Sequence, residues 1–268
     1  MTLLVSWIAV DSRGPASLYM ISDSRLTWAE KDNWDYGKKV FTFSNFPDII
    51  GYCGDVGFPI QVISHIVNLA DSGLLFGGIY SSDRKFARIK YKIQELLKSY
   101  PKTWVGQNFH ILYGTRSKEK EFACWDLKWD NKSKSWSDSK ISYSDYSDKI
   151  FVLGSGEDEF LQKYKAYQKS TENRTSRAIF HCFCDTLNSI KDKHCGGAPQ
   201  LVGLYRIRNA INFGIIYKNK RYFSGVPVDN LSSFAPIEWR NELFERMDGE
   251  TMKILKNAQR QPIPFIKY

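Results

Sequence analysis

The sequence predicts an α+β fold in which two largely antiparallel β-sheets lie between two layers of helices, an αββα sandwich. Runs of strand type and runs of helical spacing are segregated along the chain, in the order strands, two helices, strands, two helices, strands. Segregated runs favour antiparallel sheets over repeated βαβ units. The 268 residues are 43% hydrophobic and 15% aromatic, which is sufficient for a core of this size.

The amino-terminal part of the chain predicts four strands. Residues 2–10 and 18–22 are apolar runs separated by the turn residues of 11–15, which is typical of a β-hairpin. Two short strands are then expected, at residues 39–43 and 49–54.

The pattern changes to helical spacing after Pro59. Apolar residues recur at helical intervals over residues 60–70 and again over 86–97, and they predict two successive helices. The later elements follow the same logic: strands at 108–113, 121–129 and 150–153, helices at 157–168 and 177–190, and strands at 201–208 and 210–217.

The composition becomes polar after Pro227. We therefore predict a main domain over residues 2–226 and a carboxy-terminal extension over 227–268. Within the extension, Trp239–Asn257 is expected to form a helix, and a proline-containing tail ends in Phe265-Ile266-Lys267-Tyr268.

The formal charge of +9 would suit an acidic partner, but the basic residues are dispersed and often have acidic neighbours, as in residues 117–121. Nucleic-acid binding is therefore disfavoured against an ordinary solvated surface. No apolar run reaches the roughly 20 residues that span a bilayer, and no secretory segment follows Met1. The sequence predicts a soluble, cytoplasmic protein with no membrane partner.

Five cysteines in a chain with an ordinary core predict reduced thiols rather than a disulfide framework. Zinc ligation by His181, Cys182, Cys184, His194 and Cys195 is an alternative, since imidazole and thiolate are common zinc ligands. It is disfavoured because residues two apart on a helix point to different faces and no Cys-x-x-Cys pair is present. We expect no metal and no organic cofactor.

Thr2 directly follows the initiator Met1. Its small side chain permits removal of Met1, and a strand beginning at Thr2 would fix the new amino terminus in the fold. A free terminal amine has a pKa of about 8, so it can accept the hydroxyl proton of its own residue. Thr2 is therefore a candidate nucleophile that supplies its own base.

Five further segments place polar or glycine residues beside predicted elements. They are Met20-Ile21-Ser22-Asp23-Ser24-Arg25, Lys39-Val40-Phe41-Thr42-Phe43, Gly51-Tyr52-Cys53-Gly54, Leu153-Gly154-Ser155-Gly156 and Asp192-Lys193-His194-Cys195-Gly196-Gly197. Together with Thr2, and in this order, they resemble the proteasome β-subunit and bacterial HslV family of N-terminal threonine hydrolases over roughly residues 2–217. Taken singly, each also fits an ordinary role, such as a surface salt bridge for Asp23 or a helix N-cap for Ser155.

The resemblance implies a role for each matching residue. Lys39, with Lys38 as the competing choice, would stabilise the developing alkoxide of Thr2, and Asp23 would hold that lysine charged and oriented. Gly54 is the preferred oxyanion donor.

Ser155, Asp192 and Cys195 would form the cluster around the terminal amine. Cys195 stands where the family has serine, and a thiol is the weaker hydrogen-bonding group.

The implied activity is hydrolysis of amide bonds, most naturally in peptide or protein substrates, through an acyl-ester on Thr2. The family further implies a homo-oligomeric ring, an ATPase or other regulator, and a substrate pocket lined by Leu26, Gly37 and Tyr52. Residues 265–268 would suit a docking peptide, but a frayed or self-packed tail is the favoured interpretation. Two alternatives remain: a catalytically silent scaffold subunit, and an amidase of the same fold acting on a small molecule.

Overall fold

The computed structural model describes residues 2–28, 32–79, 81–118, 120–141, 143–229, 234 and 236–258. The largest of its sheets has nine strands and is antiparallel except for one pair, the parallel pair of β12 and β15. In order across the sheet they are β10 (Asp148–Leu153), β1 (Leu4–Asp11), β2 (Gly14–Ser22), β11 (Gln200–Tyr205), β12 (Ile211–Tyr217), β13 (Lys220–Phe223) and β14 (Val226–Pro227), with β15 (Trp239–Asn241) on β12 and β16 (Arg246–Met247) on β15.

The remaining strands form a five-stranded sheet and a separate hairpin. The five strands are, in order, β5 (Val40–Thr42), β6 (Asp48–Gly54), β7 (Phe109–Arg116), β8 (Phe122–Asp130) and β9 (Ser135–Lys140); the hairpin pairs β3 (Leu26–Trp28) with β4 (Asp32–Trp34). The helices are α1 (Gly57–Asp71), α2 (Ser82–Ser99), the short 3₁₀ helix η1 (Lys102–Trp104), α3 (Glu157–Tyr167) and α4 (Ser176–Ser189).

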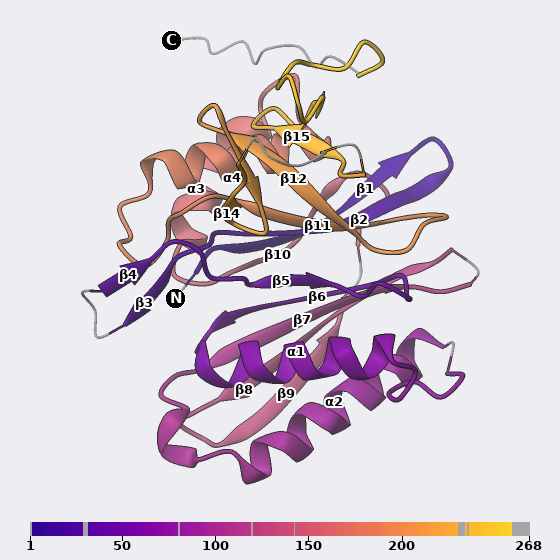
Figure 1. Cartoon of the computed structure of the whole chain (residues 1–268), viewed down its shortest axis with the longest axis vertical. Helices are drawn as coiled ribbons and strands as arrows, with labels where there is room; N and C mark the ends of the chain where they lie inside the picture. Colours follow the sequence, from indigo (N-terminus) through magenta and orange to yellow (C-terminus); the bar gives the residue numbers. More distant parts are fainter. Residues whose placement is uncertain are drawn as a thin grey trace.

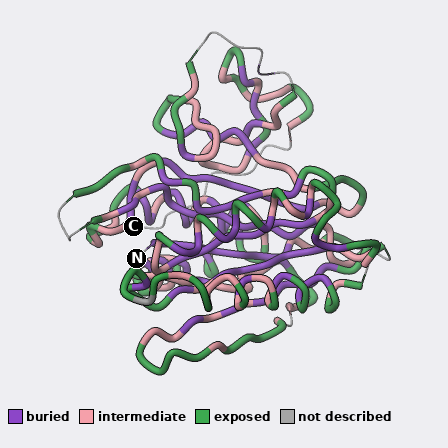
Figure 2. Tube along the Cα trace, turned by 60° about the horizontal axis from the view of Figure 1, so that its bottom comes forward, coloured by how far each residue is buried: buried purple, intermediate pink, exposed green. Residues whose placement is uncertain are grey.

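The two larger sheets face each other, and each carries helices on its other face (Figure 1). Helices α1 and α2 cover the five-stranded sheet, and α3 and α4 cover the nine-stranded sheet. Buried positions run along the strands between these layers, whereas the connecting turns are exposed (Figure 2).

Strand β1 shows why the sequence folds in this way. Its side chains alternate: Leu4 and Ile8 enter the core between the two sheets, while Val5 and Trp7 enter the core beneath α3 and α4. Both faces are therefore buried, and such a strand appears in the sequence as a continuous apolar run. This run begins at Leu3, so the fold fixes the backbone directly after Thr2.

The prediction of a two-sheet αββα sandwich is wrong, because the strands within the described ranges form three sheets. The hairpin of β3 and β4 makes the third sheet. Its strands have three residues each, and those of β4 are all exposed. Such short strands lack the apolar alternation by which a strand is recognised in a sequence.

The helix predicted over Trp239–Asn257 is also wrong. Its start forms β15, which extends the nine-stranded sheet, and β16 and a bridge from Met247 to Ile254 follow. Trp239, Met247 and Ile254 meet in one small core. Their spacings of eight and seven residues fit two helical turns, but short strands joined by turns bring the same residues together.

The division of the chain at residue 226 stays a prediction, and residues 259–268 lie outside the described residues. No helix within the described ranges has the length and apolar character needed to cross a membrane.

Candidate active site at the amino terminus

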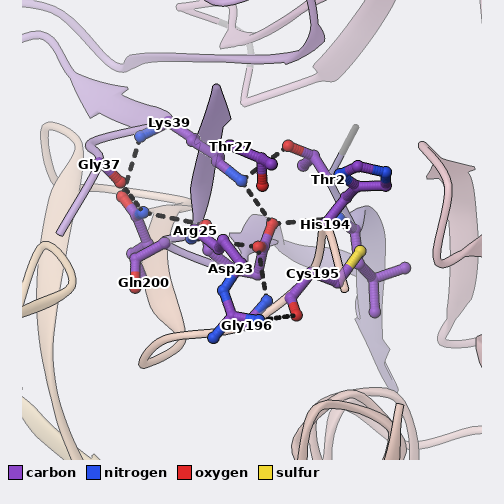
Figure 3. Close-up of polar contacts among 12 residues, drawn as sticks. Thr2, Asp23, Arg25, Thr27, Gly37, Lys39, His194, Cys195, Gly196 and Gln200 are labelled. Atoms are coloured by element: carbon purple, nitrogen blue, oxygen red, sulfur yellow. Dashed lines mark hydrogen bonds and ion pairs between the residues drawn. The ribbon is translucent and has the colours of Figure 1, made fainter. Parts of the chain in front are cut away.

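Thr2, Asp23 and Lys39 meet in a buried chain of polar contacts (Figure 3). The Lys39 Nζ donates to Thr2 Oγ1 at 2.7 Å and to Asp23 Oδ1 at 2.7 Å. Thr2 is 1% exposed, and both Asp23 and Lys39 are 0% exposed. Each of the three residues lies close to the end of a strand, which fixes its position. Thr2 comes just before β1, Asp23 just after its partner strand β2, and Lys39 just before β5 on the opposing sheet.

The Asp23 carboxylate is held from all sides. Besides Lys39, it accepts the backbone amides of Leu3 at 3.1 Å, Arg25 at 3.2 Å and Gly196 at 3.0 Å. Such donors keep a buried carboxylate in a fixed orientation and compensate its charge. The ammonium of Lys39 is thereby presented to the Thr2 hydroxyl in a single geometry.

The structure brings Lys39, and not Lys38, to Thr2. Lys38 turns the other way, with its Nζ over the Phe41 ring at 4.6 Å from the centroid. Adjacent residues of an extended chain point to opposite sides, so only one of the two lysines can reach Thr2.

A second group of predicted residues meets the Thr2 nitrogen. In this chain that nitrogen is a peptide amide, since Met1 precedes it, and it donates to Ser155 Oγ at 3.3 Å. Ser155 Oγ is 3.7 Å from Cys195 Sγ, which in turn contacts Asp192 Oδ2 at 3.5 Å. Ser155, Cys195 and Asp192 therefore form a polar path that ends at the Thr2 nitrogen.

The ionisation of this group follows from its surroundings. Burial raises the pKa of the Cys195 thiol, and the nearby charge of Asp23 adds to the effect. Burial would also raise the pKa of Asp192, but hydrogen bonds from Ser155, the His194 amide and Cys195 outweigh it, so the pKa is lowered. At neutral pH the group therefore combines a neutral thiol with a carboxylate.

Gly154 and Gly156 lie against the Thr2 backbone, and the sequence predicted no role for them. Gly154 has a φ of +102°, and a Cβ added to it would lie 2.0 Å from the Thr2 carbonyl oxygen. The Gly156 amide donates to that same oxygen at 3.3 Å. A glycine is required at position 154 both for the positive φ and for the close backbone approach.

Gly54 lies at the end of β6, opposite Phe109, with a φ of +98°. An added Cβ there would be 2.2 Å from the Asn108 carbonyl oxygen, so the packing against β7 already accounts for this glycine. Gly51 differs from Gly54 in that it lies beside Lys39: it is opposite Val40, and a Cβ added to it would be 3.3 Å from the Lys39 carbonyl oxygen. The role of Gly54 as oxyanion donor stays a prediction.

The predicted pocket residues fall into two places. Leu26 packs directly on Gly37, where an added Cβ would be 2.3 Å from the Leu26 Cγ. Tyr52 belongs instead to the core between the five-stranded sheet and helices α1 and α2.

Two further polar residues support the site: Arg25, which the sequence indicated only as part of a motif, and Gln200, which it did not indicate. Arg25 forms a paired contact with Asp35, at 2.7 and 3.0 Å, and donates to the carbonyls of Lys193 and Cys195. The buried Gln200 contacts the backbones of Asp23 and Lys39. The contacts of Arg25 with Lys193 and Cys195, and those of Gln200 with Asp23 and Lys39, join residues more than 160 positions apart in the sequence, for which no local pattern exists.

The zinc alternative finds no support in the geometry. Cys182 and Cys184 are buried in the core beneath α3 and α4. Across the part of the chain that the structure describes, no group of three or more His, Cys, Asp or Glu side chains is arranged to hold a metal ion.

Comparisons with known proteins give similarity at the level of the fold. No protein-family model matches the chain, and no curated protein matches it. Among solved structures, a Gly-1 mutant of Anbu from Hyphomicrobium sp. strain MC1 is similar with a TM-score of 0.52 and 12% identity, covering 78% of this chain and 82% of that one. Anbu from Yersinia bercovieri, described as an ancestral beta-subunit, has a TM-score of 0.53 and 10% identity, covering 75% and 82%. The chain therefore has a fold similar to that of proteasome-like β-subunits.

Proposed function

We propose that this chain is an N-terminal threonine hydrolase that cleaves amide bonds in peptides after removal of Met1. The observation that carries the proposal is the contact of 2.7 Å between Thr2 Oγ1 and a fully buried Lys39, which is itself bound to Asp23. A buried ammonium beside a hydroxyl stabilises negative charge on that oxygen more strongly than it would in water.

The proposed reaction has two halves. The free amine of Thr2 accepts the hydroxyl proton as Oγ1 attacks the carbonyl carbon of the substrate amide, and Lys39 stabilises the negative charge that develops at Oγ1. The C–N bond then breaks, the proton passes to the leaving amine, and an acyl-ester remains on Thr2. In the second half the same amine deprotonates a water, which attacks the ester, releases the acid and returns the proton to Oγ1.

Ser155 and Asp192 would orient the amine during both proton transfers. The present contact of the Thr2 nitrogen with Ser155 Oγ supports this role, because the same hydroxyl could accept a hydrogen bond from the amine after Met1 is removed. The negative charge of Asp192 would favour the ammonium form that appears after each proton transfer.

Assembly and regulation belong to the same proposal. We propose that copies of this chain form a homo-oligomeric ring enclosing the active sites, and that an ATPase or other regulator supplies substrate. The fold similarity to Anbu, described as a beta-subunit, supports an assembly.

A specific observation favours one alternative, a silent scaffold subunit. The Cys195 thiol makes long contacts, 3.7 Å to Ser155 and 3.5 Å to Asp192, where a hydroxyl would form a stronger link. An amine held by such long contacts is less firmly oriented than one held by a complete network of hydroxyl groups. Weak orientation of the amine would lower the rate of catalysis, as expected for a silent subunit.

Intact mass measured after incubation with a peptide epoxyketone tests the proposal, because that warhead reacts with both the amine and the hydroxyl of an N-terminal threonine. The expected result is loss of Met1 and gain of one inhibitor; Thr2→Ala should still lose Met1 but should form no adduct. Thr251→Ala is the matched control, since its hydroxyl donates to Asp248 in an exposed turn away from Thr2. Retention of Met1 with no adduct would refute the hydrolase and favour the scaffold.

A further inference from the structure

The proposed catalytic contact joins two sheets. Thr2 and Asp23 flank strands β1 and β2 of the nine-stranded sheet, whereas Lys39 leads into β5 of the five-stranded sheet. Thus the 2.7 Å distance between Lys39 Nζ and Thr2 Oγ1 depends on how the two sheets are held together at this edge. A displacement of about 1 Å at a reacting group can cost a hundredfold in rate.

Gln200, at the start of β11, crosses this junction with a fully buried side chain (Figure 3). Its Oε1 accepts the Lys39 backbone amide at 3.0 Å. Its Nε2 donates to the Gly37 carbonyl at 2.6 Å and to the Asp23 carbonyl at 3.1 Å. One amide group therefore connects the backbones on both sides of the catalytic pair.

The backbone around Lys39 shows what this connection does. The Tyr52 amide donates to the Lys39 carbonyl within the five-stranded sheet, whereas the Lys39 amide donates to Gln200 on the other sheet. Lys39 is thus fixed through one polar group to each sheet. The Asp23 backbone is fixed within the nine-stranded sheet alone, because its carbonyl accepts from Gln200 of β11 and its amide donates to the carbonyl of Leu3, which precedes β1.

We propose that Gln200 is a positioning residue that sets Lys39 relative to Asp23 and Thr2; its effect on catalysis rests on the function proposed above. The chemistry requires an amide of this length. It needs one acceptor for the Lys39 amide and two donors for two carbonyls, all desolvated. An ionised glutamate supplies no donors, an asparagine is one methylene short, and a methionine supplies no donor and only a weak acceptor.

The test compares Gln200→Met and Gln200→Asn with wild type and with Thr186→Val. Thr186 is also fully buried, and its hydroxyl donates to the Cys182 carbonyl within α4, so its loss removes a buried hydrogen bond outside the site. Three quantities are measured for each protein: melting temperature, kcat and KM on a peptide substrate, and hydrogen exchange of the Lys39 backbone amide.

We expect Gln200→Met to lower kcat roughly 10- to 100-fold with a smaller change in KM, and to speed exchange at the Lys39 amide. For Gln200→Asn, kcat and the exchange rate of the Lys39 amide should lie between the values of wild type and of Gln200→Met. Thr186→Val should lower the melting temperature, while its kcat and its Lys39 exchange rate stay at wild-type values. Unchanged kcat and unchanged Lys39 exchange in a folded Gln200→Met would overturn the proposal. So would a Gln200→Met that loses only stability, as Thr186→Val does.

The two proposals fail in different ways. If wild type shows no Thr2-dependent turnover but Gln200→Met still speeds exchange at Lys39, the hydrolase proposal fails and the positioning role stands. If neither Gln200→Met nor Gln200→Asn folds, hydrogen exchange of the Gln200 side-chain NH₂ group is measured in the wild-type protein instead. Protection of that NH₂ group from solvent supports its two contacts, with the Gly37 and Asp23 carbonyls, and exchange at the rate of a free amide refutes them.

Discussion

The buried pair of Asp23 and Lys39 makes a quantitative prediction about stability. In Asp23→Asn, the side chain keeps its shape but loses its charge and replaces one acceptor oxygen with a donor NH₂. One oxygen now accepts Lys39 and Leu3, and the other accepts Arg25 and Gly196. Whichever way the new amide is turned, it faces two donors with a donor.

The expected cost follows from these contacts. Removing one partner of a buried ion pair costs about 3–5 kcal/mol, because the remaining charge is left uncompensated. The total free energy of unfolding of a domain is about 5–15 kcal/mol, so the variant should lose a large part of it. For chains of about this size, the same loss corresponds to a fall in melting temperature of roughly 6–20 °C.

Equilibrium unfolding in urea, followed by tryptophan fluorescence, measures this effect. The midpoint should fall while the slope m stays constant, because the surface exposed on unfolding does not change. Glu95→Gln is the control: it neutralises a carboxylate of the exposed pair with Lys92 and should cost no more than about 1 kcal/mol. A midpoint shift in Asp23→Asn no larger than that of Glu95→Gln would refute the buried pair.

Three further predictions concern the surroundings of Thr2. Gly154→Ala and Gly14→Ala both force alanine into a positive φ, which costs roughly 1–3 kcal/mol; only the former places a Cβ 2.0 Å from the Thr2 carbonyl oxygen, so it alone should also abolish the epoxyketone adduct, and equal behaviour of the two would contradict the close approach. Cys195→Ser should raise kcat by about fivefold, the equivalent of one hydrogen bond, and an unchanged or lower kcat would show that the thiol does not limit the site. Because the pKa of Asp192 is lowered in the folded state, its charge stabilises the fold above the unfolded pKa of about 3.9, and this contribution is lost as the pH falls through the folded value; the stability advantage of wild type over Asp192→Asn should therefore be complete at pH 7 and should decline as the pH falls below about 3.9, and an advantage that does not decline there would contradict the shift.

The strongly periodic segments could be predicted from the sequence. The opening run of apolar residues is the buried strand β1, and the helical spacing after Pro59 gives α1. The reason is that each of these elements buries residues in a regular pattern, as with Val62, Ile63 and Ile66 in α1. The motifs around Thr2 could also be placed, because they sit at the ends of such elements.

The rest depended on contacts that leave no local pattern. The strand β15 is made by a parallel pairing with β12 that sets Trp239 opposite Gly214, a glycine at which an added Cβ would lie 2.4 Å from the indole ring. Nothing near Trp239 in the sequence indicates that pairing. Gln200 likewise is a single polar residue at the start of an apolar strand, and its importance appears only when Gly37 and Lys39 are brought to it.

The contacts of the site explain how removal of one residue could activate it. The positions of Thr2 Oγ1, Lys39 and Asp23 are set by side-chain and backbone contacts in which the Thr2 nitrogen takes no part. Since that nitrogen already donates to Ser155, loss of Met1 would change its chemical nature, from amide to amine, without requiring the surrounding groups to move. Such a site is preorganised, and its activity would be controlled by a single covalent event at the start of the chain.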